Sequence, residues 1–297
     1  MGHQRAAHQI LTDLFTPQTI MQDETRRKII NWYMRFDLFA SMMSGGETVL
    51  SREWFVAQSS YHTEQAASRP DDIGFKFEEY FSTQRLLATD VTLLFAAKMK
   101  GSMDNEEWVR QADLLMQKVE TFGRQIRTAY TEPSCFVQDF SGTRPPRPDD
   151  LTDYVEPGFL FGGELFTMNF VMIDFMAIEM MFKHQISRAR QQPFPTDLVE
   201  VALRSCKIFE AVEHYSLAPS GAITGCQASL GVASLFLPSD KKHTDWCRRK
   251  FALIEQRGSV FTQSSSSNLD ITDMCRLLAT STRPPSANAC LISGVKT

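Results

Sequence analysis

The chain has 297 residues, of which 43% are hydrophobic and 22% charged, a composition typical of a globular protein rather than of a disordered one. The formal net charge is only -4 and the pI is about 5.9, so the chain has no positive excess to hold a nucleic acid by its phosphates. We therefore expect one large domain or two small ones, without direct nucleic-acid binding.

The first residues, MGHQRAAHQILTDLF, contain no basic region followed by a long apolar core and a cleavage site of small residues. This predicts an intracellular protein without a secretory signal. No CxxC pair occurs among the six cysteines, which stand far apart at positions 135, 206, 226, 247, 275 and 290. Their spacing favours reduced, mostly buried thiols over a disulfide framework or a zinc cluster.

The first strongly patterned segment lies within residues 26–55. Its apolar residues recur at intervals of three and four, which predicts an α-helix with one continuous core face, made of Ile29, Trp32, Tyr33, Phe36, Phe39, Ala40 and Met43. Ser44-Gly45-Gly46 is expected to end this helix, because glycine adopts the left-handed cap conformation without strain. Ser51 is the expected N-cap of the next helix, with Glu53 in its first turn.

Helical periodicity continues in residues 78–101, which close on Gly101, and in residues 105–130. Residues 196–215 place one apolar side inward, made of Leu198, Val201, Ala202, Ser205, Ile208 and Phe209. Alternating strand patterns are scarce. The sequence therefore predicts an all-α fold, a single large domain of packed antiparallel helices.

Residues 141–158 form the clearest break, because their prolines remove backbone donors and disfavour helix for the residues before them. The most apolar run follows at 159–182 and is interrupted by Glu164, Asn169, Asp174 and Glu179. A lipid-facing helix would not tolerate these residues without partners, so we expect a buried core helix. Asp174 and Glu179, like Asp37, are expected to satisfy helix ends or to hydrogen-bond with neighbours.

The last patterned block covers residues 219–258. After a break at Pro238 to Asp240, Thr244 is the expected cap of a new helix that ends at Gly258. Its inward stripe is predicted to contain Trp246, Lys250 or Phe251, and Ile254. The helical domain is thus expected to span 1–258, and 259–297, which include SSSS at 264–267, are expected to form a partly disordered tail.

Three stretches carry a family resemblance: NWYMRFDLFASMMSGGETVLSREWF (31–55), YVEPGFLFGGELFTMNFVMIDFMAIEMMFKHQ (154–185) and GAITGCQASLGVASLFLPSDKKHTDWCRRKFALIEQRG (221–258). Together they resemble the second type of fungal-specific transcription factor domain. This is the helical regulatory region found downstream of binuclear zinc clusters in fungal regulators. The likeness runs from about residue 20 to about residue 258 in the expected order, and it makes Asp37 an interior residue.

The resemblance implies a nuclear, often dimeric regulatory domain that senses a metabolite or holds a repressed state. The six-cysteine cluster that reads DNA in such regulators is missing, and residues 259–275 replace the usual Tyr-Ile-Phe-Pro continuation. We therefore expect a protein that modulates gene expression, for example of a secondary-metabolite cluster, as a homodimer or in a mixed dimer with a full-length regulator. A small apolar metabolite is the expected ligand, in a pocket lined by Trp32, Tyr33, Phe166, Phe170 and Met176. The expected compartment is the nucleus, with the cytoplasm as the alternative.

An enzymatic alternative rests on DDLTD, residues 149–153. On a helix, Asp149, Asp150 and Asp153 would share a face and could hold Mg2+ and a prenyl diphosphate, which resembles the aspartate-rich motif of class I terpene cyclases. Lys183 and Lys207 would then bind the diphosphate, and the product would be a humulene-type sesquiterpene. The competing interpretation places the carboxylates in the first turn of a helix, favoured by its dipole, and both lysines at the surface.

No other enzyme class finds support in the sequence. The six histidines show no HExxH or similar metal spacing, and neither a GxSxG elbow, a phosphate-binding loop nor a dinucleotide-type glycine loop is found. These observations argue against a hydrolase, a kinase or a dehydrogenase, and leave open whether the chain is an enzyme at all.

Overall fold

The computed structural model describes residues 2–44 and 46–258, and within these ranges the predicted all-α fold is confirmed. Extended pairing in the described part is limited to one bridge between Phe136 and Phe161. The helices, in chain order, are α1 (Gly2–Leu14), η1 (Ile20–Gln22), α2 (Glu24–Ser44), α3 (Arg52–Ser68), α4 (Ile73–Lys100), α5 (Asn105–Thr128), η2 (Pro133–Cys135), η3 (Gly163–Thr167), α6 (Met168–Ala189), α7 (Leu198–His214), η4 (Ala222–Cys226), α8 (Gln227–Ser234) and α9 (Lys241–Gly258). The tail predicted at 259–297 lies outside the described residues, as does Gly45.

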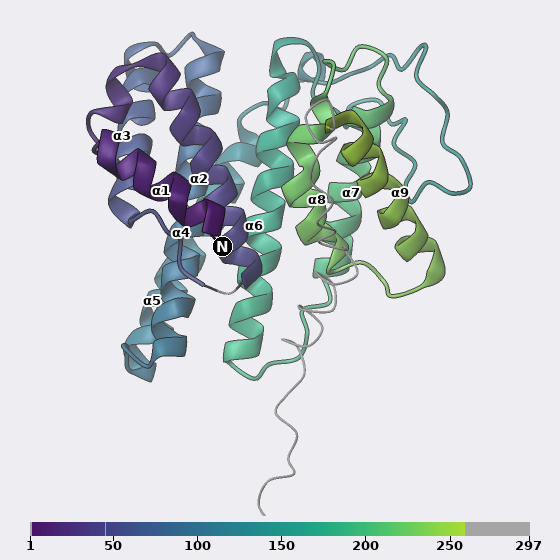
Figure 1. The fold of residues 1–297 in the computed structure, drawn as a ribbon. Coiled ribbons are helices and arrows are strands. Elements are labelled where there is room, and N and C mark those ends of the chain that lie inside the picture. The colour runs from purple at the N-terminus through teal and green to yellow at the C-terminus, as the bar shows by residue number, and fades with distance from the viewer. Residues whose placement is uncertain (1, 45, 259–297) are drawn as a thin grey trace, which may run out of the picture. The chain divides into compact units, whose positions relative to one another are not determined.

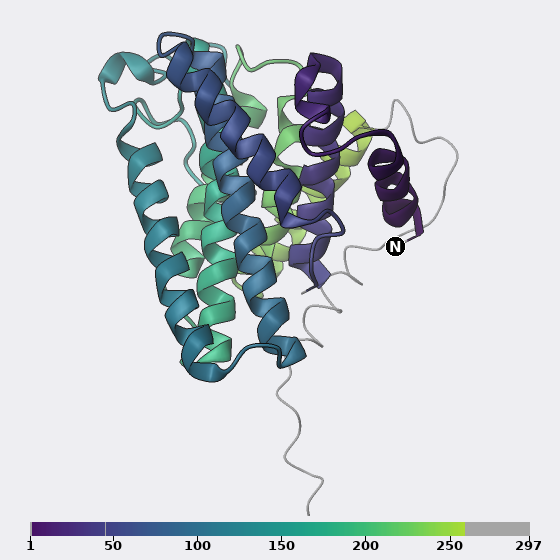
Figure 2. The ribbon, with the colours of Figure 1, turned by 90° about the vertical axis from the view of Figure 1, so that its left-hand side faces the viewer.

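The α6 helix lies between two groups of helices. Figure 1 shows α1 to α5 on one side of α6 and α7 to α9 on the other. On the first side α4 contacts α3, α5 and α6, and Figure 2 shows α4 and α5 running alongside each other. On the second side α7 and α8 contact α6, and α9 contacts α8 and η4. Residues 1–258 thus form one compact unit.

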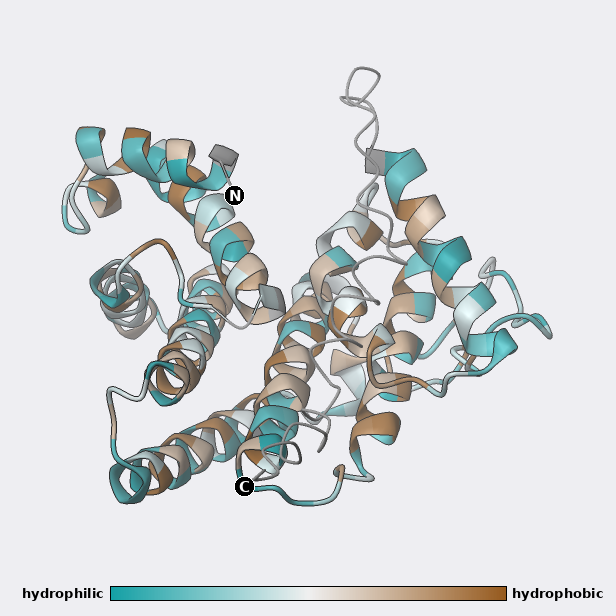
Figure 3. Ribbon diagram, turned by 60° about the horizontal axis from the view of Figure 1, so that its bottom comes forward, coloured by the Kyte–Doolittle hydropathy of each residue, from teal (hydrophilic) through white to brown (hydrophobic). Residues whose placement is uncertain are grey.

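The stretch Gly163–Ala189, which contains α6, is long and apolar enough to cross a membrane by length and composition, with a mean hydropathy of 1.6 in its most apolar window. Of that window, 72% is buried among the other helices, which agrees with the predicted core role. Figure 3 shows hydrophobic residues predominating along α6 and α8, whereas α9 is more hydrophilic. The predicted helix at 159–182 begins later than expected, at Met168, because the chain first passes through Gly162 and the turn of η3.

Close packing between α5 and α6 depends on Gly123. A Cβ at this position would lie 2.6 Å from Cζ of Phe175, closer than non-bonded carbon atoms approach. The Phe175 ring meets Phe122 edge to face, with ring centroids 5.6 Å apart. The glycine therefore lets an aromatic ring of α6 reach the surface of α5.

Several predicted helix ends are confirmed. Gly101 follows α4 in the left-handed conformation (φ 65°), and its N–H bonds to the carbonyls near the end of the helix. Ser51 precedes α3 in an extended conformation, with Glu53 in the first turn, although the Ser51 side chain makes no cap hydrogen bond to this helix. The cap predicted at Thr244 is wrong, because α9 begins at Lys241 and Asp240 accepts a hydrogen bond from the N–H of His243.

The α2 helix exposes part of the face that the sequence predicts to be buried. Ile29, Trp32 and Phe36 are 48%, 71% and 47% exposed, and the rings of Trp32 and Phe36 stack with centroids 6.2 Å apart. The buried face is rotated from the predicted one and contains Ile30, Tyr33, Met34, Asp37, Leu38, Ser41 and Met42. The prediction for Ile29, Trp32 and Phe36 is therefore wrong, because apolar residues surround most of α2 and only part of its circumference meets other helices. We call these three residues the α2 stripe.

The polar residues inside the apolar helices have the roles expected of them. The carboxylate of Asp37 is fully buried and accepts hydrogen bonds from the N–H groups of Val49 and Leu50, each at 2.9 Å. Asp174 binds Arg35 of α2 and Ser229 of α8. Glu179 of α6 likewise pairs with cationic side chains of α5 and α6. Asp37, Asp174 and Glu179 thus each form specific polar contacts inside the fold.

Candidate functional site

The five residues of the predicted apolar pocket do not share one pocket. Phe166 and Phe170 contact each other edge to face, with centroids 5.9 Å apart, and Met176 is buried in the core. Tyr33 points inward and donates a hydrogen bond from its hydroxyl to the carbonyl of Gln4. Trp32, the preceding residue on α2, is largely exposed. The structure thus brings two of the five together and places the others elsewhere.

The acidic motif 149–153 is not helical, so both sequence interpretations of it were wrong about its backbone. Residues 149–152 form turns and bends, and Asp153 has no regular structure. Asp149 faces Arg249, with 3.5 Å between carboxylate and guanidinium, whereas Asp150 is buried against Arg144 at 2.8 Å. Asp153 is exposed. The three carboxylates therefore have three different environments instead of one shared face.

The lysines predicted for a diphosphate are each engaged with carboxylates. Lys183 of α6 lies 2.8 Å from Asp197 and 3.1 Å from Glu179, and together these carboxylates raise the pKa of its ammonium despite the opposing effect of burial. Lys207 of α7 pairs with Glu156 and lies over the ring of Phe159. The partners of both lysines thus lie outside the acidic motif.

The sequence did not predict the buried polar network that surrounds Asp150. At its centre is Glu210 of α7, whose side chain is fully buried. One carboxylate oxygen accepts hydrogen bonds from the indole N–H of Trp246 (2.6 Å) and the backbone N–H of Leu151 (3.1 Å). The other accepts from the backbone N–H (3.0 Å) and the hydroxyl (2.6 Å) of Thr152. One side chain thus joins α7, α9 and the loop at 141–158.

Arg144 and Asp150 form the second part of this network. The Asp150 carboxylate accepts hydrogen bonds from the Arg144 guanidinium and from the backbone N–H of Arg147, both at 2.8 Å. Burial opposes ionisation of Asp150, but these hydrogen bonds outweigh it and hold its pKa below the ordinary value. Arg144 also contacts the ring of His214 at 2.6 Å. Burial, with Lys250 and Arg144 nearby, lowers the pKa of His214 to about 4.

Lys250 of α9 completes the network. Its ammonium lies 2.6 Å from a carboxylate oxygen of Glu213, and 3.9 Å and 4.0 Å from the carboxylates of Asp150 and Glu210. Burial nevertheless raises the pKa of Glu213. Because these charges bind one another, the network is a structural clamp on the loop at 141–158. Its sequence signal was a lysine on the inward stripe of the last helix.

A metal site is not supported by the clustering of side chains in the described ranges. Within residues 2–44 and 46–258, no group of three or more histidine, cysteine, aspartate or glutamate side chains is arranged to hold a metal ion. The donors nearest to the acidic motif are occupied by arginine, lysine and backbone N–H groups. Around the motif, the Asp150 carboxylate accepts hydrogen bonds from Arg144 and from the N–H of Arg147, and Asp149 faces Arg249.

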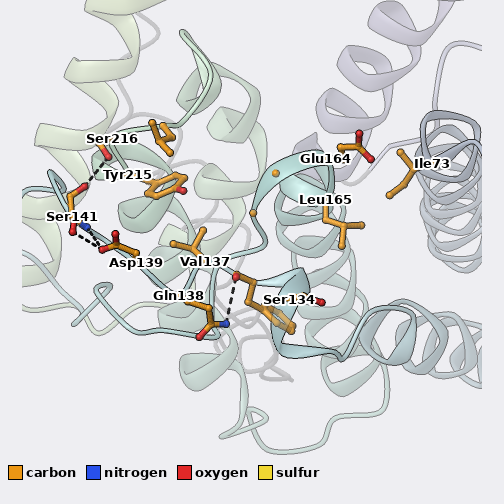
Figure 4. A pocket seen from close by; sticks show the side chains of 14 residues that line it. Ile73, Ser134, Val137, Gln138, Asp139, Ser141, Glu164, Leu165, Tyr215 and Ser216 are labelled. Atoms are coloured by element: carbon orange, nitrogen blue, oxygen red, sulfur yellow. Dashed lines mark hydrogen bonds between the residues drawn. The ribbon is translucent and has the colours of Figure 1, made fainter.

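A surface pocket of about 550 Å3 lies where residues 134–141, the turn at 162–165 and Tyr215 meet (Figure 4). Several of its polar side chains already bind one another or the backbone. Asp139 accepts hydrogen bonds from the N–H (2.8 Å) and hydroxyl (2.6 Å) of Ser141, and the Ser216 hydroxyl donates to the Ser141 carbonyl. The pocket is thus a concave surface whose polar side chains are in several cases already hydrogen-bonded. No sequence pattern indicated this pocket.

A second cluster of buried polar side chains, between α3 and α4, lacks some of its hydrogen-bond partners. Both ring nitrogens of His62, Oε1 of Gln58 and Nη1 of Arg85 are buried without a hydrogen-bond partner among the described residues. Burial, with the charges of Arg85 and Arg27 nearby, lowers the pKa of His62 to about 4, and burial lowers that of Arg85 to about 10. These groups lie in the half of the molecule that also carries the α2 stripe.

The α2 stripe is the exposed feature with the clearest binding character. Trp32 is 71% exposed, whereas the other three tryptophans, Trp54, Trp108 and Trp246, are 5% exposed or less. Large aromatic side chains that are exposed together on one helix face are typical of sites that bind another protein.

Comparisons of the chain with protein-family models, with curated proteins and with solved structures found no match.

Proposed function

We propose that this protein is a helical regulatory module of the fungal transcription-regulator type, and that it acts by binding a helical protein partner along the α2 stripe. The observation that carries this proposal is the exposure of Ile29, Trp32 and Phe36 on one face of α2, with two of their rings stacked. Spacing of i, i+3 and i+7 presents one continuous apolar row to a partner helix. The sequence resemblance supports a second copy, or the same helix of a full-length regulator, as the partner.

The acidic motif is assigned a structural role in this proposal. Asp150 holds Arg144 and the N–H of Arg147 within the loop at 141–158, and Asp149 faces Arg249, so these carboxylates order the loop and attach it to α9. The surface pocket leaves room for a small metabolite as a modulator, but its lining contains no lysine or arginine from the described part of the chain. The geometry thus favours a binding module over a prenyl-diphosphate enzyme.

Self-association tests the proposal. Light scattering after size-exclusion chromatography should show dimer formation that increases with concentration in the micromolar range. The double variant Trp32→Ser/Phe36→Ser should remain monomeric, because it removes the aromatic part of the row. Leu114→Ser is the matched control, since Leu114 is an exposed apolar residue on another helix, and it should behave like the parent.

Equal dimerisation of the parent and of Trp32→Ser/Phe36→Ser would contradict a role for the stripe. Co-expression with a full-length zinc-cluster regulator gives a second test, in which the parent should co-purify and the double variant should not. A fluorescent fusion should accumulate in the nucleus, the compartment that the resemblance implies.

A further inference from the structure

The surface pocket of about 550 Å3 carries negative charge from two different segments of the chain. Asp139 contributes one carboxylate from the segment at 134–141, and Glu164 contributes the other from η3. Figure 4 shows the two side chains on opposite sides of the pocket. None of the described residues that line the pocket is lysine, arginine or histidine. A bound anion would therefore meet only like charges there, whereas a bound cation would meet opposite ones.

The Asp139 carboxylate is held in position and keeps one oxygen open. Both hydrogen bonds from Ser141, one from its N–H at 2.8 Å and one from its hydroxyl at 2.6 Å, go to Oδ1. Oδ2 has no hydrogen-bond or ion-pair partner among the described residues. The Ser216 hydroxyl donates to the Ser141 carbonyl, which ties this turn to the residues that follow α7. The hydrogen bonds from Ser141 also hold the pKa of Asp139 below its ordinary value, so this carboxylate is ionised at neutral pH.

Aromatic packing fixes the apolar part of the pocket. The ring of Tyr215 meets Phe140 edge to face and stacks on Phe166, with centroids 5.9 Å and 6.4 Å apart. The ring of Phe136 stacks on Phe161 at 4.6 Å. Tyr215 and Phe136 both line the pocket, so its walls are formed by rings that the fold already holds in place. The volume of the pocket also lies within the range of about 300–1,000 Å3 that is typical of small-molecule sites.

We propose that this pocket binds a small organic cation, an ammonium group on an apolar body, with the ammonium at Oδ2 of Asp139 and the body against Tyr215 and Leu165. A charge-assisted hydrogen bond to the carboxylate selects an ammonium over a neutral hydroxyl. The aromatic walls accept the apolar body, and a ring face also attracts a cation. The inference assigns a ligand class to a second surface, and it does not rest on the α2 stripe, because no residue of α2 lines the pocket.

Saturation-transfer NMR on the full chain tests the inference with three probes of similar size. Phenethylammonium carries the expected charge, 2-phenylethanol is its neutral counterpart, and phenylacetate is its anionic counterpart. Phenethylammonium should show saturation transfer at millimolar concentration, which is the affinity expected of so small a ligand. The neutral and anionic probes should show several-fold less transfer, because they share the phenyl group but lack the ammonium.

Substitutions locate the binding site. Asp139→Asn should weaken phenethylammonium binding by about three- to fivefold, the effect expected of an exposed ion pair. The asparagine Oδ1 can still accept the hydrogen bonds from Ser141, so the turn itself is kept. Glu132→Gln is the matched control, since it removes the same charge from an exposed carboxylate seven residues earlier that does not line the pocket, and it should bind like the parent. The variant Trp32→Ser/Phe36→Ser should also bind the probe like the parent.

Each other outcome overturns the inference. Equal saturation transfer to all three probes would mean that the phenyl group binds regardless of charge. A preference for phenylacetate, or no transfer to any probe, would contradict a cation site. Equal weakening by Asp139→Asn and Glu132→Gln would assign the effect to the overall negative charge of the protein. The result is also independent of the proposed function: amine binding without dimerisation on the α2 stripe leaves the inference standing and overturns only the proposed partner.

Discussion

Two clusters of buried polar side chains, one on each side of α6, differ in how completely their members are paired. On the side of α7 and α9, Glu210 accepts four hydrogen bonds, and Asp150 and Lys250 each face a charged partner. On the side of α3 and α4, His62 and Arg85 retain buried nitrogens without a hydrogen-bond partner among the described residues, with the nearest carboxylate, that of Glu78, 3.9 Å from Nε2 of His62, and α2 exposes an aromatic row. The first cluster therefore pairs its charges and fixes a loop. The second cluster keeps unpaired buried groups, in the part of the molecule whose α2 helix exposes an aromatic row.

A buried polar network stabilises the fold when every member is paired, and it destabilises the fold when a member has no partner. The clamp on the loop at 141–158 meets the first condition, so its loss should be severe. The group around His62 and Arg85 meets the second, so changes there should be better tolerated. Three measurements of stability test this contrast, from the largest expected effect to the smallest.

The largest effect is expected for Glu210→Ala. The substitution leaves the indole N–H of Trp246 and the N–H groups of Leu151 and Thr152 without their acceptor, and should reduce the free energy of unfolding by about 3–5 kcal/mol. Urea denaturation of the parent and the variant measures this change in the free energy of unfolding. Glu200→Ala, at an exposed carboxylate on the same helix, is the control, and its effect should stay within about 0.5 kcal/mol. Equal effects of both substitutions would refute the clamp.

An intermediate effect is expected from acidification. Because the folded pKa of His62 is lowered to about 4, the folded protein binds fewer protons than the unfolded chain, and stability is lost as the pH falls from about 6.5 towards 4. His62 should contribute on the order of 2 kcal/mol to this loss. The variant His62→Gln should show a correspondingly shallower decline in urea midpoints. His214 shares the lowered pKa and remains in both proteins, so a pH profile unchanged by His62→Gln would contradict the assignment.

The smallest effect is expected for Arg85→Met, despite the burial of this guanidinium. Nη1 of Arg85 has no partner in the described part of the chain and burial already lowers its pKa, so an apolar side chain of similar length should change the free energy of unfolding by about 1 kcal/mol or less. Arg144→Met is the matched comparison and should cost about 2–4 kcal/mol, because it removes the arginine partner of Asp150. Thermal unfolding of the two variants side by side distinguishes them, and a larger loss for Arg85→Met would reverse the contrast.

The helices could be predicted from the sequence because their signals are local. Spacing of apolar residues located α2, α4 and α7, and glycine located the end of α4 at Gly101. Asp37 was expected inside, and it is fully buried. The buried face of α2 could not be predicted, because its sequence offers two overlapping apolar rows and only tertiary contacts decide which row is covered. Ile29 and Ile30 are adjacent in the sequence, but Ile29 is exposed and Ile30 is fully buried.

The candidate sites could be predicted less well, because they depend on distant partners. Asp150 stood out as part of an acidic motif, but its partners Arg144 and Lys250 give it a structural role that spacing alone does not reveal. Glu210 has no sequence signal of its own, since a single glutamate in a helix is ordinary. Its four donors come from the loop at 141–158 and from the last helix, both distant in the sequence.

The clamp also sets an order of events during synthesis. Arg249 reaches back 100 residues to bind the carbonyl of Asp149, and Lys250 and Trp246 complete the same network from α9. At roughly 5–20 residues per second, a ribosome needs on the order of 5–20 s to make the intervening chain. During that interval the loop at 141–158 has been synthesised without its final partners. The helices α3, α4 and α5, which follow one another in the chain and pack together, have the time to fold first, and translation speed thus becomes a determinant of how reliably the loop is closed.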